Sequence, residues 1–131
     1  MELKKYQQET LDCLKKYISI IRRYRQEGQA AGLAFMILRT DTQDRFPKEY
    51  HWIPEIGRSP FVCIKVPTGG GKTLIAAHAV GTICSDYLGE RADKGLVMWF
   101  VPSDAIRTQT LSIYAIATIL TGNFWISDFI T

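Results

Sequence analysis

The chain has 131 residues, of which 47% are hydrophobic and 22% charged, enough apolar material for one globular core. Its formal charge of +3 is compatible with a polyanionic partner but too small to identify one. The three cysteines are widely spaced, without a CxxC pair or a histidine cluster that could hold a metal, so we expect reduced and mostly buried thiols. The charged N-terminus lacks the apolar core of a secretory signal, which favours a cytoplasmic protein.

Apolar side chains recur at helical spacing over residues 3–25, which predicts an amphipathic N-terminal helix that ends near Gly28. The predicted apolar face consists of Leu3, Tyr6, Thr10, Leu11, Leu14, Ile18 and Ile21. The short apolar run Leu33–Leu38 is a strand candidate. Residues 39–60 hold three of the five prolines and are predicted to form a long loop.

Two further apolar runs, Phe61–Val66 and Leu96–Val101, each stop at a proline and are predicted to be strands. Between them, Thr73–Tyr87 is apolar nearly all round and is predicted to be a buried helix. A strand–helix–strand order implies a parallel sheet, and therefore an α/β fold.

A glycine-rich loop joins the first of these strands to the helix. Three consecutive glycines let backbone N–H groups turn inward around a phosphate, and the helix start adds its partial positive charge. Lys72 would supply a full charge to the phosphates of ATP, and the Thr73 hydroxyl would bind Mg²⁺. The loop is therefore predicted to be a phosphate-binding P-loop, made of Pro67, Thr68, Gly69, Gly70, Gly71, Lys72 and Thr73. The strict P-loop pattern has glycine where this chain has Val66, and His78 is interpreted as a structural residue.

The segment 60–80 closely resembles motif I of superfamily 2 DEAD/DEAH-box helicases, in the branch of the type III restriction enzyme motor subunit. Residues 97–109 resemble motif Ia of the same family. The resemblance implies a partial RecA-like P-loop NTPase domain that follows the N-terminal helix, with ATP and Mg²⁺ as ligands. It also implies sequence-independent contacts to the DNA backbone, for which the matching residues are Pro102, Ser103 and Arg107.

The opening segment Leu3–Gln8 resembles the family pattern in which a glutamine reads the adenine edge, and Gln7 is the matching residue. Two interpretations stay open for Gln7: an adenine contact or a solvated helix residue. The same holds for Arg107, either a phosphate contact or a solvated residue at a helix start.

The last part of the chain departs from the family. The sequence has no Asp-Glu dipeptide to supply the acidic pair of the motor, and Asp128 lacks a partner acid. Residues 108–127 carry no charge, but their polar residues and the Gly122-Asn123 turn favour a buried helix and strand over a membrane span. We therefore expect one incomplete ATP-binding domain over residues 1–131, with a core at 61–110 and an atypical apolar tail at 111–131.

These features predict the ATP-binding N-terminal part of a DNA helicase or restriction-type translocase, truncated and unable to hydrolyse ATP alone. The expected partners are DNA and the remaining motor domain or a modification subunit, with no membrane. Two alternatives remain: a small P-loop phosphotransferase, or a non-catalytic interaction or membrane-associated remnant.

Overall fold

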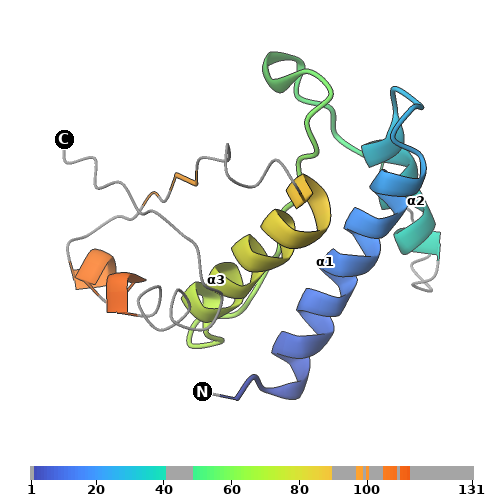
Figure 1. Ribbon diagram of the computed structural model, residues 1–131. Helices are drawn as coiled ribbons and strands as arrows, with labels where there is room; N and C mark the ends of the chain where they lie inside the picture. The colour runs from blue at the N-terminus through green and yellow to red at the C-terminus, as the bar shows by residue number, and fades with distance from the viewer. Residues whose placement is uncertain are drawn as a thin grey trace. The chain divides into compact units, whose positions relative to one another are not determined.

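The computed structural model describes residues 2–40, 49–89, 97–98, 100, 105–108 and 110–112 (Figure 1). In this part of the chain every regular element is helical, and residues 105–108 and 110–112 are helical as well. The named elements are α1 (Lys5–Arg23), α2 (Ala30–Thr40), the 3₁₀ turn η1 (Pro54–Ile56), α3 (Lys72–Thr82) and the π-helical turn η2 (Ile83–Leu88). They fall into two compact units, Met1–Pro67 and Thr68–Thr131.

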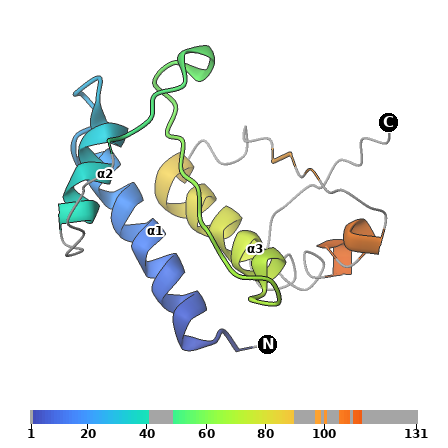
Figure 2. The same ribbon diagram turned by 180° about the vertical axis from the view of Figure 1, so that it is seen from behind.

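The predicted parallel sheet, and with it the RecA-like α/β fold, is wrong, because none of the described residues lies in a strand. Phe61–Val66 forms an irregular connection without ladder hydrogen bonds (Figure 2). Phe61, Val62 and Ile64 are 45%, 41% and 41% exposed. A β-strand is stable only when its backbone N–H and C=O groups pair with a neighbouring strand. A composition rich in β-branched and aromatic residues does not provide that neighbouring strand. Within 96–101, only residues 97, 98 and 100 are described, and they are irregular and exposed.

The predicted N-terminal helix is confirmed as α1, which buries one apolar face. The buried side chains follow the helical period at Leu11, Leu14, Tyr17, Ile18 and Ile21. Arg22 and Arg23 occupy the last turn, where their positive charges interact favourably with the partial negative charge of the helix C-terminus. The N-terminal part of the predicted face is not buried.

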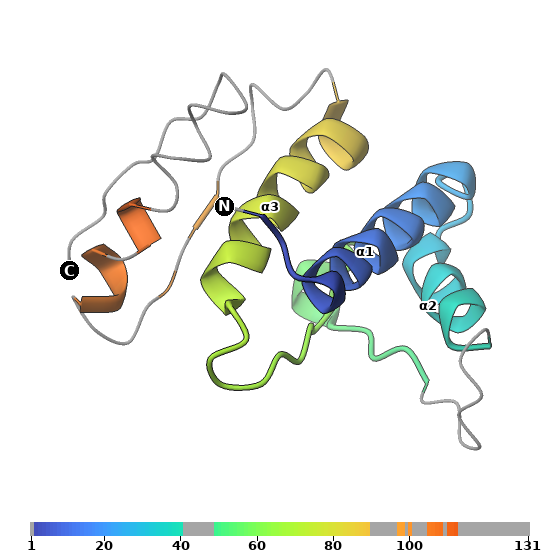
Figure 3. The ribbon, with the colours of Figure 1, turned by 90° about the horizontal axis from the view of Figure 1, so that it is seen from below.

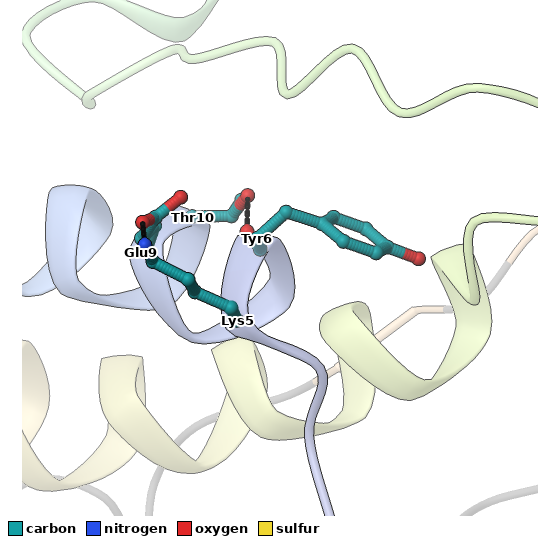
Figure 4. Close-up of polar contacts among 4 residues, drawn as sticks. All are labelled: Lys5, Tyr6, Glu9 and Thr10. Atoms are coloured by element: carbon teal, nitrogen blue, oxygen red, sulfur yellow. Dashed lines mark hydrogen bonds and ion pairs between the residues drawn. The ribbon is translucent and has the colours of Figure 1, made fainter.

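The first turns of α1 carry local polar contacts instead (Figure 4). The Thr10 hydroxyl donates to the Tyr6 carbonyl at 2.7 Å, and Lys5 Nζ lies 3.9 Å from a Glu9 carboxylate oxygen. Both ends of this ion pair are largely exposed, so it contributes little to stability. The Tyr6 side chain is 38% exposed. The apolar face of α1 thus begins at Leu11 rather than at Leu3.

The predicted strand Leu33–Leu38 is wrong, because these residues lie in α2. The segment is rich in alanine, leucine and methionine, which favour helix, and Ile37 is its one β-branched residue before the terminal threonine. Four small residues of α2, Ala30, Ala31, Gly32 and Ala34, are buried, and α2 lies beside α1 in Figures 1 and 3. The buried Tyr17 hydroxyl of α1 donates to the Ala31 carbonyl at 3.3 Å.

An aromatic cluster fixes the described part of the predicted loop, residues 49–60, on α2. The Tyr50 ring lies 5.6 Å from the ring of Phe35 and 4.8 Å from that of Trp52. The Trp52 indole covers Gly32, where an added Cβ would lie 3.1 Å from its Cζ2 atom. The Tyr50 hydroxyl accepts a hydrogen bond from the Phe61 N–H at 2.7 Å. The loop is therefore tied to the helix pair at both of its aromatic residues.

The predicted helix Thr73–Tyr87 is confirmed as α3 followed directly by η2, which ends at Gly89 with φ of +55°. Its buried residues are Ile75, Ala77, Thr82 and Cys84, and burial raises the pKa of the Cys84 thiol above its ordinary value. All three cysteines are free thiols, but Cys13 and Cys63 are exposed. The prediction of mostly buried thiols is therefore wrong for those two.

No helix within the described residues is long and apolar enough to cross a membrane. Residues 113–131, which include Asp128 and most of the predicted tail, lie outside the described part of the chain.

Candidate nucleotide-binding site

The glycine-rich loop makes a tight turn at Thr68–Gly70 and then begins α3 (Figure 3). Gly69 has φ of +76°, and Gly71 has φ of +71° and ψ of +39°. Both are left-handed conformations that a residue with a Cβ adopts at a cost of roughly 1–2 kcal/mol. The glycines predicted from the P-loop pattern are therefore required by the backbone at two positions.

Gly71 is the N-cap of α3, and its carbonyl accepts the first helical hydrogen bond, from the Ile75 N–H at 3.0 Å. Among the described residues no side chain caps this helix start, and its first turn has no acidic residue. The first N–H groups of any α-helix have no carbonyl of the helix to bind and carry a partial positive charge. This helix start is electrostatically suited to an anion.

Lys72 and Thr73 are the first two residues of α3, so their side chains leave the helix at the same end as the glycine turn. Lys72 is exposed, Thr73 is half-buried and Gly70 is buried. An exposed ammonium, a hydroxyl and a glycine turn with left-handed residues are the groups that a polyphosphate and its Mg²⁺ require. The residues present therefore fit Mg·ATP.

The structure gathers Thr68, Gly69, Gly70, Gly71, Lys72 and Thr73 in one turn of the unit Thr68–Thr131. Pro67, which is exposed, is the last residue of the other unit, to which Gln7 also belongs. Arg107 is half-buried in the helical residues 105–108, and Pro102 and Ser103 lie outside the described residues.

Gln7 is 4% exposed, so the interpretation as a solvated helix residue is wrong. Its Oε1 accepts the Lys4 N–H at 2.9 Å, while its own backbone N–H donates to the Lys4 carbonyl at 2.9 Å. Its Nε2 donates to the Tyr6 hydroxyl at a long 3.4 Å. Gln7 therefore ties down the start of α1. Gln7 stands three residues after the N-cap, as in a capping box, but the N-cap is Lys4 rather than Ser, Thr, Asp or Asn, so the sequence carries only half of that signal.

Other polar residues do not form a second centre. His78 is exposed on α3, and within the described residues no group of three or more His, Cys, Asp or Glu side chains could hold a metal ion.

Comparison with known protein families finds a match that covers most of the chain. The family model described as "Type III restriction enzyme, res subunit" matches residues 1–124. No curated protein and no solved structure matches the chain.

Proposed function

The chain belongs to the type III restriction enzyme res-subunit family, and on this premise we propose that it binds Mg·ATP as part of a DNA motor. The observation that carries the proposal is the pair of left-handed glycines at the start of α3, followed directly by Lys72. Backbone N–H groups of the glycine turn cradle the phosphates, Lys72 adds a charge-assisted contact, and the Thr73 hydroxyl binds Mg²⁺. In a complete motor, hydrolysis of the bound ATP would supply the free energy that is converted into movement.

The test is isothermal titration calorimetry of the full chain with Mg·ATP. Lys72→Ala removes a charge-assisted contact of about 1.5–3 kcal/mol and should weaken the affinity by roughly tenfold to hundredfold. Lys65→Ala is the matched control, because Lys65 is also exposed but lies outside the loop. Equal affinities of the Lys72→Ala variant, the Lys65→Ala variant and the unaltered chain would refute the P-loop assignment.

The chain alone would hold ATP without turning it over at the rate of a motor. Hydrolysis needs an acidic group to position water and Mg²⁺, and the sequence has no Asp-Glu dipeptide. It also needs an arginine finger, which contributes roughly 10³–10⁵ in rate and which other parts of a motor supply. The remaining motor domain or a modification subunit is the proposed partner. DNA-stimulated phosphate release that disappears in Lys72→Ala would contradict this part of the proposal.

The proposed contacts to DNA are sequence-independent and go to the phosphate backbone through Pro102, Ser103 and Arg107. The logarithm of the binding constant for such contacts should fall linearly with the logarithm of the salt concentration, because each neutralised phosphate releases counterions. Sequence-selective binding that survives high salt would show that another surface reads the DNA.

A further inference from the structure

A shallow hollow of about 260 Å³ lies within the unit Met1–Pro67, away in sequence from the glycine turn. It is lined by Gly28, Gln29, Trp52, Gly57 and Arg58. Pockets that enclose a small molecule usually measure roughly 300–1,000 Å³, so this hollow is too small and too open for an enclosed cofactor. Its small size and open shape suit a single planar group that carries a charge.

Trp52 provides a stacking surface that is already held in place. Its indole rests on Gly32 of α2 and meets the Tyr50 ring edge-on at 4.8 Å. Tyr50 is fixed in turn by the 2.7 Å hydrogen bond from the Phe61 N–H. Trp52 nevertheless keeps 38% of its surface exposed. An indole that is ordered before binding stacks on a planar ligand with little further loss of side-chain entropy.

Arg58 places a guanidinium at the other side of the same hollow. Its Cζ and Nη1 lie 3.1 and 3.2 Å from the point where a Cβ on Gly28 would stand, so the guanidinium rests close against the Gly28 backbone. Gly57, with φ of +59°, makes the turn that precedes Arg58. Within the described part of the chain, the Arg58 side chain forms no ion pair or hydrogen bond.

Gln29 also lines the hollow, and neither its carboxamide nor the Trp52 indole N–H has a protein partner among the described residues. A stacking ring beside a guanidinium and a carboxamide matches a nucleotide: a base for the ring, a phosphate for the guanidinium and base-edge atoms for the carboxamide. A duplex would not satisfy this set, because its bases are stacked on one another.

We propose that this hollow binds one nucleotide of a single-stranded nucleic acid, with the base on Trp52 and a phosphate on Arg58. The inference rests on the proposed DNA partner but uses no residue of the glycine turn. Failure here therefore leaves ATP binding by Lys72 unaffected, and loss of ATP binding leaves this contact intact.

The experiment is fluorescence anisotropy of a labelled oligothymidylate with the full chain at fixed salt. Trp52→Ala and Arg58→Ala should each weaken binding about tenfold. Trp52→Phe keeps an aromatic face and should retain most of the affinity. Lys15→Ala, which removes an equal charge from an exposed position on α1, should cause a much smaller loss.

Circular dichroism melting of each variant separates folding from binding. Arg58 is exposed, so Arg58→Ala remains a valid test even if Trp52→Ala unfolds the chain. The proposal is overturned if Arg58→Ala binds as well as Lys15→Ala, or if Trp52→Phe binds as poorly as Trp52→Ala. It is also overturned if duplex DNA competes as well as the single strand.

Discussion

Gly69 and Gly81 are glycines of the same unit, but the backbone requires only one of them. Gly69 has φ of +76°, whereas Gly81 lies inside α3 with an ordinary helical φ, and an added Cβ would meet nothing within 4 Å at either position. Conformation alone, without steric contact, therefore separates the two sites. The P-loop pattern identified the first from sequence, since a glycine turn before a GKT sequence needs left-handed backbone.

Substitution by alanine at these two glycines should have opposite effects on stability. Gly69→Ala forces a Cβ into a left-handed residue and should destabilise the chain by roughly 1–2 kcal/mol, with weaker ATP binding. Gly81→Ala restrains the unfolded chain and should stabilise it by about 0.5–1 kcal/mol. Thermal unfolding followed by circular dichroism measures both. If both substitutions changed the stability in the same direction, Gly69 would not hold its left-handed conformation in solution.

One substitution can separate the observed capping role of Gln7 from the predicted adenine contact. Glutamate keeps an oxygen for the Lys4 N–H, as in a capping box, but loses the amide N–H that an adenine contact needs. Gln7→Glu should therefore leave the melting temperature nearly unchanged and abolish any preference for ATP over GTP, as measured by calorimetry. Gln7→Ala is the comparison, because it should lose both. A Gln7→Glu variant that still prefers ATP would restrict Gln7 to its structural role.

At the scale of elements, helices were predicted from sequence far better than strands. The helical spacing of the apolar residues Leu11, Leu14, Ile18 and Ile21 depends only on residues close in sequence, and it predicted α1 correctly. Leu33–Leu38 is a short apolar run without turn residues inside it, and such a run fits a buried helix as well as a strand. What decides the outcome is the row of small residues Ala30, Ala31 and Ala34, which permits close packing on another helix.

Ala34 tests this helix pair, because its side chain is completely buried. Ala34→Leu adds three carbon atoms to a packed contact and should destabilise the chain by about 1–3 kcal/mol in urea unfolding. Met36→Leu on the same helix is the control, since Met36 is 62% exposed and should tolerate the change. A neutral Ala34→Leu would mean that α2 does not pack through its alanine face.

At the scale of the whole molecule, sequence resemblance identified the family and located the glycine turn but did not predict the architecture. Motif residues are consecutive, so the turn at residues 68–73 could be located without knowing its neighbours. Strands depend on partners elsewhere in the chain, and Phe61–Val66 has none among the described residues. The hollow lined by Trp52 and Arg58 gave no sequence signal, because it depends on how residues 52–58 fold back against Gly28 and Gln29.

The buried thiol links protonation to the stability of the whole chain. Because the pKa of Cys84 is raised in the folded state, the unfolded chain ionises first as pH rises. Stability is complete below about pH 8.5, the ordinary thiol pKa, and falls as pH rises towards the folded value. Urea midpoints at several alkaline pH values should therefore fall less steeply for Cys84→Ala than for Cys13→Ala. Identical slopes would exclude Cys84 as the cause.

The different solvent exposure of the three cysteines also predicts how the protein oxidises during storage. Cys84 is buried, but Cys13 and Cys63 both face solvent as free thiols. A molecule with a single outward thiol stops at a covalent pair when air oxidises it, whereas two outward thiols give each copy two points of attachment. We therefore expect preparations kept without a reductant to form disulfide-linked dimers and then longer oligomers, with the dimers present before any loss of folded structure.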